Sequence, residues 1–176
     1  TRYISVTGVQ TCALPIYYPG GRSSFIIRMN HQARLWGMSQ THFSDPSGLG
    51  VFNTSTVHDV ANLVITASGY WFIIEATKKK QVAFETKYKK KISTINLAHT
   101  SGQLLFAFDN VLVSKTGLTS SAGWCVAMLA EQNKQQYVIV VLGSRNKSER
   151  LKTVRDIRYN HIVDTNLHAL EIPTNY

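Results

Sequence analysis

The residues best suited to chemistry lie in the second half of the chain, at Lys115-Thr116-Gly117. An apolar, β-branched run from Val111 leads directly into them, and a second apolar run starts at Trp124. This pattern is typical of an edge strand that lines a cleft, because Gly117 lacks the Cβ that would block an extended peptide from pairing alongside. Lys115 supplies a cation and Thr116 a hydroxyl, so this end of the strand could hold a carboxylate. The simpler alternative is a strand that leaves through a Lys-Thr-Gly turn.

A second set of motifs precedes this strand. They are Met29-Asn30, Gly37-Met38, a T-x-F-x-D-P-S-G-L element that begins at Thr41, and an N-x-S-T-x-x-D element that begins at Asn53. Together with K-T-G-x-T-x-x-A-G from Lys115, they resemble the serine D-alanyl-D-alanine peptidases. That family contains the low-molecular-mass penicillin-binding proteins, which are carboxypeptidases and endopeptidases of bacterial peptidoglycan. The resemblance covers residue 18 to about residue 162.

The resemblance implies an α+β fold of the penicillin-binding-protein and β-lactamase type, with an antiparallel sheet flanked by helices. It implies that Lys115 and Thr116 bind the carboxylate of a peptidoglycan peptide or of a β-lactam inhibitor, and that Gly117 permits its close approach. The backbone N–H of Leu118 would be one of two catalytic oxyanion donors. A serine would attack a D-Ala–X bond and form an acyl-enzyme, and a neighbouring lysine would take the hydroxyl proton.

In this family the serine and the lysine lie in an S-x-x-K element, and an S-x-N element follows it. Both precede the segment that corresponds to Met29-Asn30, and neither occurs upstream of that segment here. We therefore expect the nucleophile helix and the N-terminal strands to be absent from the chain, and the chain by itself to be inactive. The sequence Ser144-Arg145-Asn146 matches S-x-N, but it follows Lys115, so we interpret it as a turn.

The first sixteen residues have a different origin in our interpretation. Residues 6–16 are the translation of DNA that resembles a common sequencing-library adapter, so we expect them to be foreign to the protein. The expected organisation is then a foreign segment over 1–16, the C-terminal part of a D,D-peptidase domain over 17–163 and a short tail over 164–176. Such a piece would leave one sheet edge unpaired, which predicts poor solubility.

The composition fits one domain with a buried core. The 176 residues include 19 Lys and Arg and 10 Asp and Glu, and removal of residues 1–16, which hold Arg2 and no acid, leaves 18 − 10 = +8. Cys125 would then be the remaining cysteine, and one thiol says nothing about the redox compartment. We interpret it as a small packed hydrophobe. No apolar run reaches the length of a membrane span, and we expect no metal and no cofactor.

Lysines gather between residues 78 and 91, at positions 78, 79, 80, 87, 89, 90 and 91. Nucleic-acid binding would use such cations, but Tyr88 is the one aromatic residue among them, which is too few for base stacking. Attraction to anionic envelope polymers or lipid headgroups is a second interpretation. The simplest is a solvated loop. We therefore expect no nucleic acid as a partner, and the resemblance to the D,D-peptidases implies peptidoglycan peptides instead.

Three helices and several strands are expected from the periodicity. The first helix covers 22–36, with Phe25, Met29, Ala33 and Trp36 on its buried stripe, and Gly37 ends it. The second starts at Thr56 with a capping box to Asp59, buries a stripe that begins with Val57, and ends at Gly69. A last helix covers 148–162. Strands are expected at 82–84, 92–95, 111–115, 124–129 and 137–142, whereas 103–108 fits either helix or strand.

The segment 44–48 is expected to be a turn. His42, Asp45 and Ser47 lie close together there, but catalytic triads normally converge from distant parts of a chain, so we interpret them as local hydrogen bonding.

Three functions stay open after this reasoning. The favoured one is a serine-type D,D-peptidase of the periplasm or the extracytoplasmic envelope. The short tail slightly favours an endopeptidase over a carboxypeptidase. The others are a β-lactamase-like hydrolase and a non-catalytic relative that binds peptidoglycan.

Overall fold

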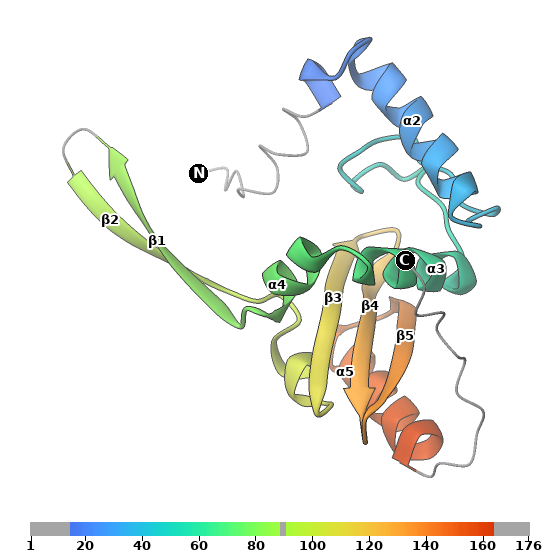
Figure 1. Ribbon diagram of the computed structural model, residues 1–176, viewed down its shortest axis with the longest axis vertical. Coiled ribbons are helices and arrows are strands. Elements are labelled where there is room, and N and C mark those ends of the chain that lie inside the picture. The colour runs from blue at the N-terminus through green and yellow to red at the C-terminus, as the bar shows by residue number, and fades with distance from the viewer. Residues whose placement is uncertain (1–14, 89–90, 164–176) are drawn as a thin grey trace. The chain divides into compact units, whose positions relative to one another are not determined.

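The structure, a computed structural model, describes residues 15–88 and 91–163 (Figure 1). The chain divides into two compact units between Leu63 and Val64, and each is described by itself. Over the described ranges no single helix is long and apolar enough to cross a membrane. Helices α3 and α4 pass that test only as a pair, bent by 101°, on length and composition.

The first unit contains helix α2, Gly21–Leu35, close to the predicted 22–36. Gly37 ends the helix as predicted, because it takes a φ of +73° that other residues adopt at a cost. The Met38 N–H then donates to the Ala33 carbonyl and the Gly37 N–H to the Arg34 carbonyl, at 2.9 and 3.1 Å. These two bonds form a Schellman motif and satisfy carbonyls that the helix leaves free.

The predicted apolar stripe of α2 is only partly buried. Ala33 is buried, whereas Phe25, Met29 and Trp36 are half-buried. The last three line a cavity of about 460 Å³ within the first unit. The predicted stripe residues therefore lie on one side of α2, as expected. The described residues of this unit do not fill the cavity on that side.

Asp45 organises the loop that follows α2. Its carboxylate accepts hydrogen bonds from the backbone N–H groups of Ser47, Gly48 and Gly50, from the Ser47 hydroxyl and from the Asn53 amide. Burial by itself would raise the pKa of Asp45, but these donors lower it to about 2. The turn predicted at 44–48 is therefore confirmed, and this cluster is local hydrogen bonding.

Helix α3, Val57–Ser68, starts as predicted, because the Thr56 hydroxyl accepts a hydrogen bond from the Asp59 N–H at 3.1 Å. The second hydrogen bond of the expected capping box, from the Thr56 N–H to the Asp59 carboxylate, does not form. The buried Asp59 carboxylate instead accepts from the Gln40 N–H and the Thr41 hydroxyl, at 2.8 and 2.7 Å. The expected burial of Val57 is also wrong, since 53% of it is exposed.

The second unit is built on a three-stranded antiparallel sheet in the order β3-β4-β5, with strands Asn110–Thr119, Gly123–Gln132 and Gln135–Ser144. Each strand is longer than the predicted one and includes it. Asn133 and Lys134 join β4 to β5 with positive φ values of 53° and 64°, as a tight two-residue hairpin needs.

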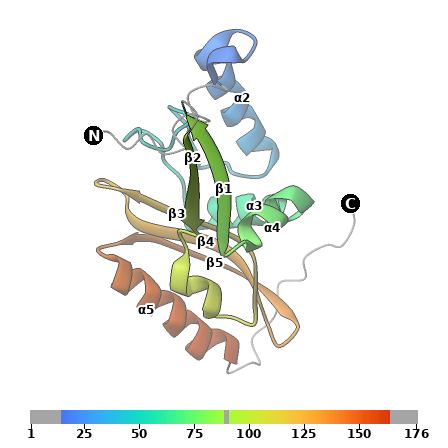
Figure 2. The same ribbon diagram turned by 90° about the vertical axis from the view of Figure 1, so that its left-hand side faces the viewer.

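Helices cover the two faces of this sheet (Figure 2). On one face α5, Lys147–Ile157, contributes Val154 to a core with Val126 and Met128. On the other face Val64 and helix α4, Trp71–Lys78, pack against Val113 and Leu129. The sheet therefore lies between two helical layers, which confirms the predicted α+β architecture.

The structure makes three local expectations more specific. The segment 103–108 is mostly a 3-10 helix, η1, Gly102–Phe106. The last helix changes at Arg158 into a π-helix, η2, Arg158–Val163. The two short strands expected near the lysines are longer and form one antiparallel hairpin, β1, Gln81–Tyr88, with β2, Lys91–Ala98.

Candidate functional site

The predicted site residues lie together on β3, which is an edge strand of the sheet (Figure 1). Lys115 and Gly117 are opposite Ala127 and Cys125 of β4 in the pairing register. Thr116 and Leu118 alternate with them along the strand. Leu118 is 53% exposed. In the described ranges, the outer edge of β3 is not paired with a strand.

A short segment after β2 runs along this edge, and no sequence pattern predicted it. The Thr116 hydroxyl donates to the Thr100 hydroxyl at 2.9 Å. The hydroxyls of Ser101 and Ser114 also share a hydrogen bond, and both side chains are buried. Residues 99–101 therefore fix the strand at the point where its polar side chains begin.

His99 is the titratable group of this segment. Its Nδ1 accepts a hydrogen bond from the Ser101 N–H at 3.0 Å. Burial and the positive charge of Lys115 lower the pKa of His99 below its usual 6.5, and a hydrogen bond to the backbone of Thr77 only partly opposes them. A neutral imidazole thus lies near the Lys115 ammonium, which itself donates to the Thr116 carbonyl.

Gly117 is not required by the fold. Its backbone does not take a positive φ, and a Cβ built on it would meet only the Cβ of Cys125, at an ordinary 3.7 Å. The described part of the protein therefore leaves open space above this glycine. The absence of a side chain here is better explained by the approach of a ligand than by packing.

A second cation, Arg150 of α5, lies one strand away from Gly117. Arg150 is 3% exposed, its Nη1 donates to the Cys125 carbonyl at 3.1 Å, and its guanidinium lies 5.4 Å from the centre of the Trp124 ring. Its Nε has no hydrogen-bond partner. Sequence reasoning missed this residue, because an arginine on an amphipathic helix has no distinguishing pattern.

Ser144 and Asn146 are structural, as predicted. The Asn146 side chain caps α5 by accepting the Glu149 N–H at 2.8 Å. With Lys147 they also have the S-x-x-K spacing, which the sequence reasoning overlooked. Ser144 ends β5 and Lys147 starts α5, so serine and lysine do not share one turn of helix.

Two side chains near the end of β3 make local hydrogen bonds. Thr119, the last residue of β3, accepts the Ala122 N–H with its hydroxyl at 3.0 Å. Cys125 is half-buried, and its thiol donates to the Ala122 carbonyl at 3.4 Å. Within the described ranges no group of three or more His, Cys, Asp or Glu side chains could hold a metal ion.

Comparison with known proteins identifies the family. The family model described as D-alanyl-D-alanine carboxypeptidase, peptidase S11, matches residues 5–146. The chain belongs to the D-alanyl-D-alanine carboxypeptidase family. This match begins inside residues 1–16, and the first fourteen of these lie outside the described residues, so their foreign origin stays a prediction.

Two curated relatives of this peptidase family are D-alanyl-D-alanine endopeptidases. The Escherichia coli protein is 31% identical over 137 residues, which are 77% of this chain and 43% of that protein. The Pseudomonas aeruginosa protein is 31% identical over 132 residues, 74% of this chain and 41% of that protein. The chain therefore spans about two fifths of the length of these relatives.

The solved structures agree on the fold. The Streptomyces K15 DD-transpeptidase superposes with a TM-score of 0.75 at 24% identity, over 88% of this chain and 66% of that one. A D-alanyl-D-alanine carboxypeptidase from Mycobacterium tuberculosis superposes with a TM-score of 0.71 at 19% identity, over 94% and 66%. The α+β architecture of this chain is thus that of the D,D-peptidases.

Proposed function

We propose that this chain is the C-terminal part of a serine-type D-alanyl-D-alanine peptidase that cleaves peptidoglycan peptides through an acyl-enzyme. The single observation that carries the proposal is the edge strand β3, where Lys115, Thr116 and the unobstructed Gly117 lie in series beside an unpaired edge. An extended peptide can add to such an edge through its backbone.

In this proposal Lys115 and Thr116 hold the carboxylate of the substrate. The ammonium supplies charge and the hydroxyl supplies a directed hydrogen bond, and together they orient a D-Ala terminus or a β-lactam. The neutral state of His99 keeps a second positive charge away from Lys115 at neutral pH. The Leu118 N–H would donate to the oxyanion that develops in the transition state, and loss of one such donor typically costs about 10²–10³ in rate.

The serine and the lysine that complete the reaction belong to sequence upstream of Tyr17 in this proposal. The serine oxygen attacks the carbonyl carbon while its proton moves to the lysine, the amine leaves with a proton, and water then cleaves the ester. The extracytoplasmic envelope is where this substrate occurs. Both curated relatives described above are named endopeptidases, which supports that type over a carboxypeptidase.

The proposal is tested on the full-length protein of the source organism with fluorescent penicillin. DNA upstream of the Tyr17 codon is sequenced first, and we expect it to encode S-x-x-K and then S-x-N in place of residues 1–16. A long-lived fluorescent adduct would then support the D,D-peptidase, because it shows acylation without rapid hydrolysis. Rapid turnover of the adduct would indicate a β-lactamase-like hydrolase instead. A full-length protein with no adduct would indicate a relative that binds peptidoglycan without cleaving it.

A further inference from the structure

The β1–β2 hairpin has an apolar face that no other described element covers. Val82 is opposite Leu97 and Phe84 is opposite Ile95 in the register. Directly opposed residues of antiparallel strands share a face, and so do residues two apart along a strand. These four side chains therefore lie on one face. Val82, Leu97 and Ile95 are 42%, 46% and 38% exposed, and Phe84 is half-buried.

The hairpin extends from the sheet of the second unit, and its principal packing is between its own two strands (Figure 1). The His99 N–H donates to the Lys80 carbonyl at 2.9 Å and closes its base. A two-stranded hairpin alone is marginally stable in water. A surface that buried the apolar face would therefore stabilise this element.

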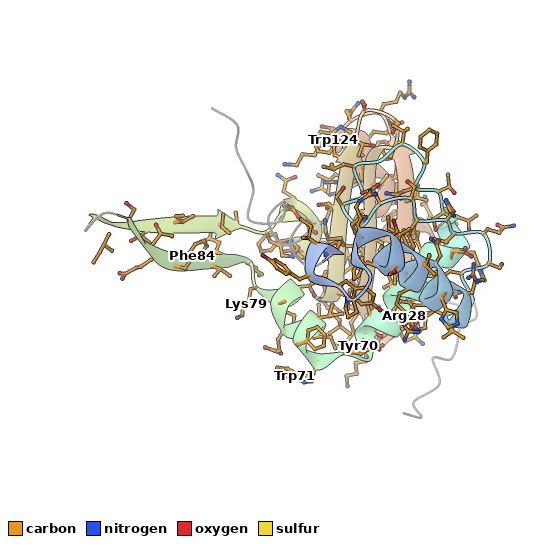
Figure 3. All side chains as sticks on the ribbon, turned by 90° about the horizontal axis from the view of Figure 1, so that it is seen from above. Arg28, Tyr70, Trp71, Lys79, Phe84 and Trp124 are labelled. Carbon is orange, nitrogen blue, oxygen red and sulfur yellow. The ribbon has the colours of Figure 1, made fainter. Side chains whose placement is uncertain are left out.

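The positive charge near the apolar face of the hairpin indicates which kind of surface could bind it. Between residues 78 and 91 the sequence has seven lysines and one acid, Glu85. Three of these lysines, Lys78, Lys79 and Lys80, come directly before β1, at the base of the hairpin. Cations therefore lie next to one end of the apolar face. Figure 3 shows Phe84 on the hairpin and Lys79 at its base.

We propose that the β1–β2 hairpin is an interfacial membrane anchor, which places its apolar face in the outer layer of an anionic lipid surface while Lys78, Lys79 and Lys80 at its base contact the headgroups. Interfacial elements combine these two features, since apolar burial and attraction to anionic lipid add. A second copy of the chain fits less well, because it would bring two sets of seven lysines together. An anionic polymer would match the lysines and leave Val82 and Leu97 in water.

Vesicle co-sedimentation of the whole chain tests this anchor, with vesicles of 30% phosphatidylglycerol in phosphatidylcholine against pure phosphatidylcholine. We expect binding to the anionic vesicles, weaker binding at high salt and weak binding to the neutral vesicles. The face variant Phe84→Ser with Leu97→Ser should lower the partition coefficient by at least about tenfold. The matched control is Ile92→Ser, which changes an apolar residue, 60% exposed, on the opposite face of the hairpin.

The base variant replaces Lys78, Lys79 and Lys80 by Gln and should lower the partition coefficient by roughly a hundredfold, since each cation near an anionic surface contributes a factor of about five. Lys134→Gln with Lys147→Gln is its control. Circular dichroism of each variant verifies folding.

Three outcomes would overturn the anchor. Equal loss of binding in Ile92→Ser and in the face variant would show that the apolar face is not the contact. Full binding by the face variant would leave an anionic polymer as the partner. Self-association without vesicles that the face variant abolishes would identify a second copy as the occupant. None of these outcomes depends on acylation by penicillin, so the anchor and the proposed function can fail separately.

Discussion

At the scale of single residues, the surroundings of Asp45 and His99 shift the pKa of each side chain. Asp45 has five donors to its carboxylate and a pKa of about 2. His99 has a nearby cation and partial burial, and its pKa moves below its usual value. Each shift has a consequence that a titration can measure.

Asp45 should make the protein sensitive to strong acid. Because its folded pKa lies below the ordinary 3.8, its contribution to stability is present above pH 3.8 and is lost as the pH falls through 2. The loss should be about 2 kcal/mol in the free energy of unfolding. Urea unfolding at several pH values measures it. Asp45→Asn should be less stable at pH 7 and should lose this pH dependence, whereas the exposed Asp156→Asn should retain it.

His99 should titrate below 6.5, and Lys115→Met should raise its pKa, because the nearby positive charge is gone. Since the folded state disfavours the imidazolium, the contribution of His99 to stability is present above pH 6.5 and decreases as the pH falls from there to the folded pKa. NMR of the His99 ring protons follows the titration. Lys134→Met serves as the control, and an equal shift in both variants would refute a specific effect of Lys115.

At the scale of elements, one glycine serves the fold and another the proposed ligand: Gly37 ends α2, and Gly117 lies on the proposed ligand-binding edge of β3. Gly37→Ala should lower the free energy of unfolding by about 1 kcal/mol, because φ is +73° there. Gly117→Ala should leave it within about 0.5 kcal/mol, since its Cβ has room.

In the full-length enzyme, the Gly117→Ala change should nevertheless lower the rate of acylation by penicillin about a hundredfold, because the added methyl group displaces the ligand from the strand. Stopped-flow labelling measures that rate. A variant that folds normally and is acylated at the normal rate would remove β3 from the binding site.

Periodicity predicted the strands β3, β4 and β5, which bury side chains in the core. It also predicted α2, although the stripe of that helix is only partly buried. It did not predict the full length of β1 and β2, because no core buries one side of the hairpin and lysines interrupt the apolar pattern. The contacts of Thr100 with Thr116 and of Ser101 with Ser114 join residues 13 to 16 positions apart. Small hydroxyl residues are common, so such contacts leave no signature in one sequence.

At the scale of the whole molecule, the sheet has two outer edges, β3 and β5, that pair with no other strand in the described ranges. Exposed edges promote association between chains. We expect the 176-residue chain to aggregate as its concentration rises, and the longer protein of the proposed function to remain monomeric. Light scattering across a concentration series compares the two. Identical behaviour would show that the upstream sequence does not cover an edge.

The segment at residues 99–101 connects two parts of the second unit over a very short length of chain. The hairpin ends at Ala98, and Thr100 and Ser101 are already hydrogen-bonded to β3. A lipid surface that held the hairpin would therefore set the height of β3 above the membrane. This short connection would keep β3 at a fixed distance from the lipid surface. The proposed site could then reach only those peptide cross-links of the wall that lie at the same distance.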